Sequence, residues 1–191
     1  MLDKIEAHRF MYRFIKNQIQ IYEFEQWLYS HDELEDLLGD KEYFDFVSRD
    51  YKNKYAFQDT EKQIRNLISL GFFEQERILD LLNKLIQNDN EPLRIMERLY
   101  DDYCDGYNFL RYIALYFIST SDEYLEVLKN DQIRLQQYLA PIKVDAKRLL
   151  AYFEKDELSI VVENVYTDKR DVVDRIELHS INEMLAKKKE P

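Results

Sequence analysis

The sequence predicts a mainly α-helical protein: a compact, bundle-like domain of short and medium helices, with a short strand or hairpin near 159–178. Only 3 glycines and 3 prolines occur in 191 residues, whereas hairpin-rich folds use many such residues in their turns. Apolar residues make up 46% of the chain, and many recur at the three- and four-residue spacing of a helix face. We expect a single helical domain over 1–191, or the same domain with 158–191 as a loosely packed C-terminal extension.

The first part of the chain predicts four short helices. Two of them cover about residues 3–17 and 22–29. The third, in ELEDLLG, is expected to end at Gly39, because glycine readily adopts the backbone conformation that follows a helix. The fourth, in KEYFDFVSRDY, is expected to bury one apolar side. The side chains expected to cap these helices are Ser30, Asp32 and Asp40. The buried side of the fourth helix is expected to hold Tyr43, Phe44 and Val47.

From residue 59 the helical spacing is more regular. One helix is expected to stop at Gly71, and the next carries an apolar stripe over 78–86. Pro92 then falls in the first turn of a third helix, where its missing N–H costs little. This helix is expected to continue through DDYCDGYNFLRYIALYF (101–117) as the buried central helix, with Gly106 where another helix approaches closely. Its core-facing residues, which lie within about 40° of one line at 100° per residue, are Leu99, Tyr103, Gly106, Leu110, Ile113 and Phe117.

The last third of the chain predicts two more helices and a strand. Ser121 is the expected cap of a helix that begins STSDEYLEVL, and Pro141 is expected to separate it from a helix in VDAKRLLAYFEKDEL. The segment 159–166, SIVVENVY, is β-branched and predicts a strand. The following DVVDRIEL either pairs with that strand across TDKR or is helical and runs on toward Met184. The tail from Ala186 is expected to fray.

Charge and composition exclude several classes of function. The formal net charge of −11 and the absence of clustered Lys and Arg before Lys187 argue against nucleic-acid binding. No segment has the roughly 20 apolar residues of a membrane span, and the charged N-terminus has no signal-peptide pattern. A single cysteine excludes an internal disulfide, so we expect a cytoplasmic protein.

Chemistry-bearing motifs are absent from the sequence, and we expect no cofactor, no metal and no catalytic site. The three histidines, His8, His31 and His179, are far apart and fit no metal-ligand spacing. Asp101 and Asp105 lie one helical turn apart, a spacing that is typical of a solvated helix face. The carboxylates near Cys104 disfavour its thiolate, so an activated cysteine is not expected.

The segment from Glu23 to Asp45 is strongly acidic and is the expected protein-binding surface. Nine of its residues are acidic and one, Lys41, is basic. Such a run is commonly a solvated helix face, but it also suits a basic partner, because complementary charge speeds association and aromatic side chains supply anchors. The expected contact residues are Glu23, Glu25, Trp27, Tyr29, Asp32, Glu33, Glu35, Asp36 and Asp40.

Three segments resemble small helical bacterial immunity proteins of polymorphic toxin systems, especially those of Firmicutes. The family pattern F-E-x-W-[LV]-Y corresponds to residues 24–29, E-L-E-x-L-L-G to 33–39, and Y-C-x-G-Y-x-F-L to 103–110. The resemblance covers roughly 15–118 and brings no catalytic residues with it. It implies a cytosolic protein that binds and neutralises a toxin domain, often a nuclease, whose basic cleft an acidic inhibitor can block.

Three functions are therefore open. The first is a non-catalytic, protein-binding immunity protein that uses the acidic segment. The second is a regulatory or adaptor domain that binds a peptide or small ligand in an aromatic groove lined by Tyr107, Tyr112 and Tyr116. The third, least favoured, is an enzyme that uses Asp101 and Asp105 with a metal.

Overall fold

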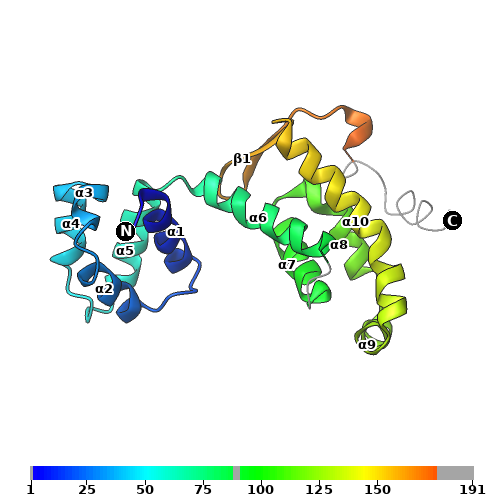
Figure 1. The fold of residues 1–191 in the computed structure, drawn as a ribbon, viewed down its shortest axis with the longest axis horizontal. Coiled ribbons are helices and arrows are strands. Elements are labelled where there is room, and N and C mark those ends of the chain that lie inside the picture. The colour runs from blue at the N-terminus through cyan, green and yellow to red at the C-terminus, as the bar shows by residue number, and fades with distance from the viewer. Residues whose placement is uncertain (1, 88–90, 176–191) are drawn as a thin grey trace. The chain divides into compact units, whose positions relative to one another are not determined.

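The computed structural model describes residues 2–87 and 91–175. Within these ranges it has ten α-helices, two short 3-10 helices and one two-stranded antiparallel sheet (Figure 1), which confirms the predicted mainly α class. The chain divides into two compact units, Met1–Phe73 and Glu74–Pro191, and each has a hydrophobic core of its own. The chain thus has two hydrophobic cores, and the expectation that residues 1–191 form a single domain stays a prediction.

The first unit is built from helices that pack around an aromatic core. Phe14, Phe24 and Phe46 are fully buried there, and the Phe14 and Phe24 ring centroids lie 4.6 Å apart. Rings of this kind bury large apolar areas, so they dominate the energetics of a small core. The helices are α1 (Lys4–Ile15), α2 (Ile21–Tyr29), α3 (Leu34–Leu38), α4 (Asp40–Val47) and α5 (Ala56–Leu67), followed by the start of α6 (Leu70–Ile86).

Two expectations for the first unit concern where helices end. Gly39 follows α3 with φ +90°, and its predicted role as the stop is confirmed. Gly71 was expected to be a stop as well, but it lies in the first turn of α6, because α5 already ends at Leu67 and Ile68 takes the extended backbone after it.

The fourth helix and the expected caps differ from the prediction. In α4 the buried aromatic residue is Phe46, whereas Phe44 is 66% exposed, because Phe46 packs against Phe24 with the ring centroids 5.8 Å apart. Neither Ser30 nor Asp32 caps α3, which starts after Glu33 without a side-chain cap. Asp40 is the first residue of α4 and does not cap it.

The second unit contains the remaining helices and the sheet. Its core is continuous from the later turns of α6 to the hairpin and includes the fully buried Leu82, Leu99 and Leu139. Its elements after α6 are α7 (Pro92–Cys104), η1 (Asn108–Leu110), α8 (Arg111–Ile118), α9 (Asp122–Asn130), α10 (Gln132–Glu154), β1 (Leu158–Val162), β2 (Val165–Asp168) and η2 (Val172–Asp174).

The stretch 101–117 is not one continuous helix, so the predicted central helix is wrong in this respect. Helix α7 ends at Cys104, and Gly106 follows it with φ +117°, which a helix cannot contain. A short 3-10 turn leads into α8. Gly106 is therefore needed for its backbone conformation and not for a close approach of another helix. Its nearest neighbour beyond the adjacent chain is the backbone oxygen of Asn164 in the hairpin.

Two helix predictions near α9 and α10 had opposite outcomes. Ser121 caps α9 as predicted, since its hydroxyl accepts a hydrogen bond from the N–H of Tyr124. Pro141 does not separate two helices, because α10 continues through it from Gln132 to Glu154. Buried Tyr138 and Ile142 flank the proline on the same helix, so packing outweighs the lost hydrogen bond. No helix in residues 2–87 and 91–175 has the length and apolar character needed to cross a membrane.

The predicted strand 159–166 is in fact most of a hairpin. Strands β1 and β2 pair antiparallel, and Asn164, with φ +62°, lies in the turn that interrupts the expected strand. Leu158 and Ile160 are buried in the second core, and the N–H of Ile160 donates to the side-chain oxygen of Gln75. The start of β1 is therefore packed in the second core, whereas the loose extension expected over 158–191 stays a prediction. The structure describes residues 171–175 of DVVDRIEL, and they do not pair with β1: Val172–Asp174 form η2, and β2 takes the place beside β1. The expectations for Met184 and for the tail from Ala186 lie outside the described residues.

Candidate functional site

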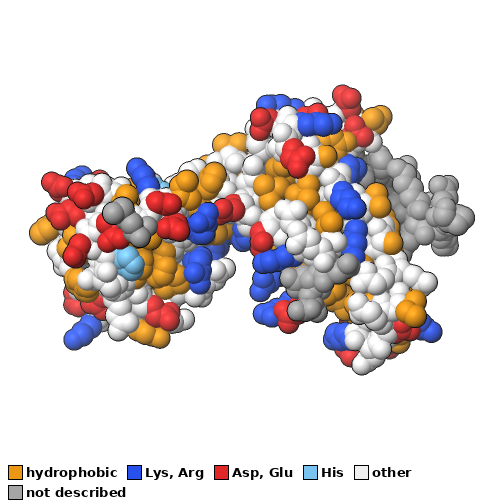
Figure 2. All heavy atoms as spheres, in the orientation of Figure 1, with side chains coloured by type: hydrophobic (Ala, Val, Ile, Leu, Met, Phe, Trp, Pro, Cys, Tyr) orange, Lys and Arg blue, Asp and Glu red, His pale blue; other side chains and the backbone are white. Residues whose placement is uncertain are grey.

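The acidic surface of the first unit is formed by the end of α2, by α3 and by α4. We define it by four exposed carboxylates and two exposed aromatic residues: Asp32, Glu35, Asp36, Asp40, Tyr29 and Phe44. Acidic side chains gather over α3 and α4 in the space-filling view (Figure 2). Glu35 and Asp36 of α3 and Asp40 at the start of α4 lie on either side of Gly39, and all three are exposed.

Side-chain interactions show that the surface is contiguous. The phenol of Tyr43 has a raised pKa, first because of partial desolvation and then because of the nearby charges of Asp32 and Glu35 and the phenol of Tyr29. The Tyr29 hydroxyl donates to the carbonyl oxygen of Val47 at 3.0 Å. This bond holds the exposed Tyr29 ring of α2 against the end of α4, so that the ring belongs to the same surface as the carboxylates.

Three of the nine expected contact residues have structural roles instead. Trp27 is 8% exposed and its ring stacks on Phe10 at 4.3 Å, so it belongs to the core. The Glu23 carboxylate accepts a hydrogen bond from the N–H of Gln20 and is part of the capping box at the start of α2. The Glu33 carboxylate accepts from the N–H of Leu2, and hydrogen bonds from its own N–H and from that of Leu2 lower its pKa. The structure therefore leaves Glu25, Tyr29, Asp32, Glu35, Asp36 and Asp40 for a partner.

Phe44 is the residue of this surface that sequence reasoning missed as a contact. It is apolar and sits next to Tyr43, so a helical pattern assigns it to the core. Its exposure follows from the register of α4, in which Phe46 takes the buried position. The only sequence signal was the pair of phenylalanines two residues apart, since both cannot face one side of a helix.

The aromatic stretch 101–117 is structural in most of its length. The hydroxyl of the buried Tyr107 accepts a hydrogen bond from the N–H of Asn164 and so ties the turn after α7 to the hairpin. Burial raises the pKa of Tyr107 to about 12, although the hydrogen bond from Asn164 opposes the shift. This phenol stays neutral and lines none of the three cavities described in the structure.

A buried ion-pair cluster links α6 and α7. Asp102 is 7% exposed and accepts from both terminal nitrogens of Arg77 at 2.9 and 2.6 Å. Glu74 accepts from Arg77 as well. Burial by itself would lower the pKa of Arg77, but the hydrogen bonds and charges of Asp102 and Glu74 outweigh it and raise that pKa. Arg77 thus bridges two buried carboxylates, and the arrangement is that of a structural network.

The Asp101–Asp105 pair is not assembled into a metal site in the structure. Both carboxylates and Cys104 are exposed. Among the residues that the structure describes, no group of three or more His, Cys, Asp or Glu side chains has the geometry to hold a metal ion. His8 and His31 belong to the first unit, and His179 lies outside the described residues.

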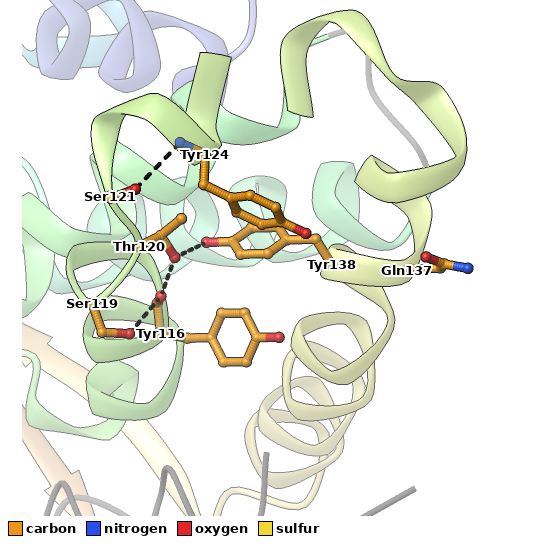
Figure 3. Close-up of a pocket in the computed structure, with 7 residues that line it drawn as sticks. All are labelled: Tyr116, Ser119, Thr120, Ser121, Tyr124, Gln137 and Tyr138. Carbon is orange, nitrogen blue, oxygen red and sulfur yellow. Dashed lines mark hydrogen bonds between the residues drawn. The ribbon is translucent and has the colours of Figure 1, made fainter. Parts of the chain in front are cut away.

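The second unit contains a polar aromatic cavity of about 500 Å³ between α8, α9 and α10, which we call the tyrosine pocket (Figure 3). The rings of Tyr116 and Tyr138 lie 5.1 Å apart and those of Tyr124 and Tyr138 lie 6.4 Å apart, in both cases edge to face. Tyr124 is 42% exposed, whereas Tyr116 and Tyr138 are nearly buried. The lining residues are Tyr116, Ser119, Thr120, Ser121, Tyr124, Gln137 and Tyr138.

Of the three tyrosines expected to line an aromatic groove, the structure places only Tyr116 in this pocket. The Tyr107 hydroxyl is hydrogen-bonded to the hairpin instead. Burial raises the pKa of Tyr112 to about 12, and the charge of the nearby Asp145 adds to this shift. Tyr124 and Tyr138 are not among the residues predicted to line a groove. They come from two further helices, and no spacing within one helix could reveal that they meet.

Two features of the described chain therefore have the chemistry of a binding site: the acidic surface in the first unit and the tyrosine pocket in the second. The first suits a large basic partner, and the second has the size of a small-molecule site. Comparison with protein-family models, curated proteins and solved structures finds no match for this chain.

Proposed function

We propose that this protein is a non-catalytic protein-binding module, an immunity protein that acts in the cytoplasm and neutralises a basic toxin or nuclease domain through the acidic surface. The observation that carries the proposal is that four exposed carboxylates on that surface are not neutralised by ion pairs within the described residues. Within residues 2–87 and 91–175 none of Asp32, Glu35, Asp36 and Asp40 forms an ion pair. Their charge is available to a partner.

The two aromatic residues of the surface support the same proposal. Tyr29 and Phe44 are 56% and 66% exposed, and aromatic side chains surrounded by charge are typical anchors of protein interfaces. The carboxylates around them would steer a basic partner, while the rings would supply apolar contact. The resemblance of residues 24–29, 33–39 and 103–110 to immunity proteins supports the choice of a toxin as the partner. The exposed free thiol of Cys104 suits a reducing compartment.

The experiment is co-expression with the product of the adjacent reading frame, followed by a measurement of growth and of binding. We expect the wild-type protein to restore growth and to form a complex whose association rate falls as salt rises. The triple variant Asp32→Lys, Glu35→Lys, Asp36→Lys is expected to slow association by about 10-fold or more at low salt. Glu23 and Glu33 stay unchanged because they support the fold.

The matched control places the same change of charge elsewhere. Glu97 and Asp101 of α7 and Glu154 of α10 are exposed acidic residues of the second unit, and reversing all three alters the net charge equally. Association is expected to stay within about 2-fold of wild type in this control. If both triple variants slow association alike, net charge and not the acidic surface governs binding, and the proposed surface is wrong.

A second candidate function is favoured by the tyrosine pocket. A regulatory or adaptor protein that binds a ligand needs a concave site with a few directed polar groups, and the pocket between α8, α9 and α10 offers one. This function does not require the acidic surface, so the two proposals are tested independently.

A further inference from the structure

The tyrosine pocket has no charged side chain in its lining, although the chain as a whole carries a net charge of −11. Its walls are three phenol rings, and the rings of Tyr116 and Tyr124 meet that of Tyr138 at 63° and 64°. Walls at such angles present ring faces in more than one direction. The face of an aromatic ring carries partial negative charge, so it attracts a cation.

Three of the six hydroxyl groups that line the pocket mainly present lone pairs to it. The Ser119 and Thr120 hydroxyls both donate to the carbonyl oxygen of Tyr116, at 3.1 and 3.0 Å (Figure 3). A hydroxyl has one proton, so Thr120 must accept from the Tyr138 hydroxyl, which lies 2.9 Å away. The protons of all three hydroxyls are thus engaged within the protein. What these oxygens offer to a ligand is acceptor capacity.

The start of α9 beside the pocket does not offer an anion site. The backbone N–H of Glu123 and the Ser121 hydroxyl hydrogen-bond to the Glu123 carboxylate and lower its pKa. Negative charge therefore already occupies the position where a helix N-terminus attracts it. Asp122 adds a second exposed carboxylate in the same turn. A phosphate or carboxylate ligand would meet two like charges here.

From these observations we infer that the tyrosine pocket binds a quaternary ammonium group, either of a free small molecule such as choline or of a trimethylated lysine on another protein. The ring faces attract the cation, the oxygens of the engaged hydroxyls direct lone pairs toward its positively polarised methyl groups, and the acidic chain raises its local concentration. The cavity of about 500 Å³ accommodates such a group. This inference rests on the second candidate function, the binding of a ligand in the pocket.

The first experiment compares two probes of equal shape and different charge on the full-length protein. Choline and its neutral carbon isostere 3,3-dimethylbutan-1-ol are titrated while the tyrosine ring resonances are followed by NMR. We expect choline to shift the resonances of the pocket tyrosines and to bind at least about 5-fold more tightly than the alcohol. Equal binding of both would leave the pocket as a ligand site and overturn the ammonium class. Binding of neither would overturn both.

Variants of Tyr124 identify the site, because this residue is exposed enough to be replaced without loss of the fold. Tyr124→Leu removes a ring and is expected to weaken choline binding by about 2- to 30-fold. Tyr124→Phe keeps the ring and is expected to stay within about 2-fold of wild type. The matched control is Tyr22→Leu, which removes an exposed tyrosine of the first unit. A loss of affinity in this control, or none in Tyr124→Leu, would place the site elsewhere.

A third comparison distinguishes the two sources of the ammonium group. A short peptide with trimethyllysine is titrated beside the same peptide with unmodified lysine and beside free choline. Tighter binding of the trimethylated peptide than of choline indicates a protein-borne ligand, and equal binding indicates a free quaternary ammonium compound. Equal binding of the two peptides would contradict recognition of the alkylated cation, because a strongly hydrated primary ammonium group gains less from aromatic rings.

Discussion

At the scale of single residues, the backbone of Gly106 organises the aromatic-rich stretch of the chain. Its φ of +117° ends α7 and turns the chain toward η1 and α8. Side chains with a Cβ rarely adopt this conformation. The ideal Cβ position lies 3.6 Å from the backbone oxygen of Asn164, which is an ordinary contact, so backbone strain and not crowding explains the need for glycine.

Replacing this glycine should therefore destabilise the protein through the backbone. Gly106→Ala is expected to lower the free energy of unfolding by about 1–3 kcal/mol, measured by urea denaturation. The neighbouring Asp105 is exposed and has φ −77°, so Asp105→Ala is the control and should change stability by less than about 0.5 kcal/mol. Equal stability of the wild type and Gly106→Ala would show that the turn tolerates a side chain.

A second residue with a distinct physical role is Asp145 of α10. Its side chain is 4% exposed in total, and one carboxylate oxygen accepts from the Arg148 side chain at 2.8 Å. The other oxygen has no hydrogen-bond partner. Burial raises the pKa of Asp145 above its ordinary value of 3.8, and the charges of Arg148 and Arg170 only partly oppose this shift.

The raised pKa gives a signed prediction for stability. Between pH 3.8 and the higher pKa of the folded state, the native protein binds more protons than the unfolded chain, so Asp145 makes the free energy of unfolding fall as pH rises. Stability curves of wild type and Asp145→Asn are compared across this range. We expect the difference, wild type minus variant, to fall with rising pH. A difference that rises with pH would mean that the carboxylate is stabilised in its charged form.

At the scale of elements, α10 shows how packing overrides a local signal. Proline inside a helix removes one backbone hydrogen bond and crowds the preceding turn, and α10 nevertheless continues through Pro141. Buried residues before and after the proline, such as Leu139 and Ile142, anchor both halves of the helix in the second core. If the chain turned away at Pro141, the two halves could not both bury these residues in the second core. Apolar burial therefore stabilises the continuous helix.

This view predicts that Pro141 lowers stability in the natural sequence. Pro141→Ala is expected to raise the free energy of unfolding by about 1–3 kcal/mol, measured by chemical denaturation. The chain supplies its own control in Pro92, the first residue of α7, where a missing N–H costs little. Pro92→Ala should not stabilise the protein. A stabilisation of similar size in both variants would show that the position of Pro141 inside a helix is not its cause, because the effect of Pro→Ala on the unfolded chain has the opposite sign.

At the scale of the whole molecule, the two hydrophobic cores are the main feature. The aromatic core of Met1–Phe73 and the larger core of Glu74–Pro191 share no residue. The acidic surface belongs to the first unit and the tyrosine pocket to the second. Each candidate site is thus supported by a different core.

Separate cores predict separate unfolding. Phe24→Ala in the first core and Phe109→Ala in the second, both fully or almost fully buried, are each expected to cost about 3–5 kcal/mol in their own unit. Hydrogen exchange measured by mass spectrometry should become faster in α1, α2 and α5 for Phe24→Ala, and in α7, α8 and α10 for Phe109→Ala. Faster exchange throughout the chain in both variants would show one cooperative domain, as expected over 1–191.

The sequence by itself determined the helical class, the stop at Gly39, the first turn at Pro92 and the cap at Ser121, because each depends on composition or on the chemistry of a few neighbouring residues. It also located the acidic segment, since charge is visible in the residue types alone. What it left open or assigned wrongly depends on contacts between distant residues. Pairing of Phe46 with Phe24 exposes Phe44, burial holds α10 together through Pro141, and Asn164 turns the expected strand into a hairpin.

Only the tertiary structure could decide which side chains form a site. The tyrosine pocket joins Tyr116, Tyr124 and Tyr138 from three helices, and the acidic surface loses Trp27 to the core and gains Phe44. Both outcomes follow from which face of each helix is buried, and burial is a property of the assembled core. Local spacing fixes the directions of side chains along one helix, whereas the neighbours that they meet are set by the packing of all the helices in a unit.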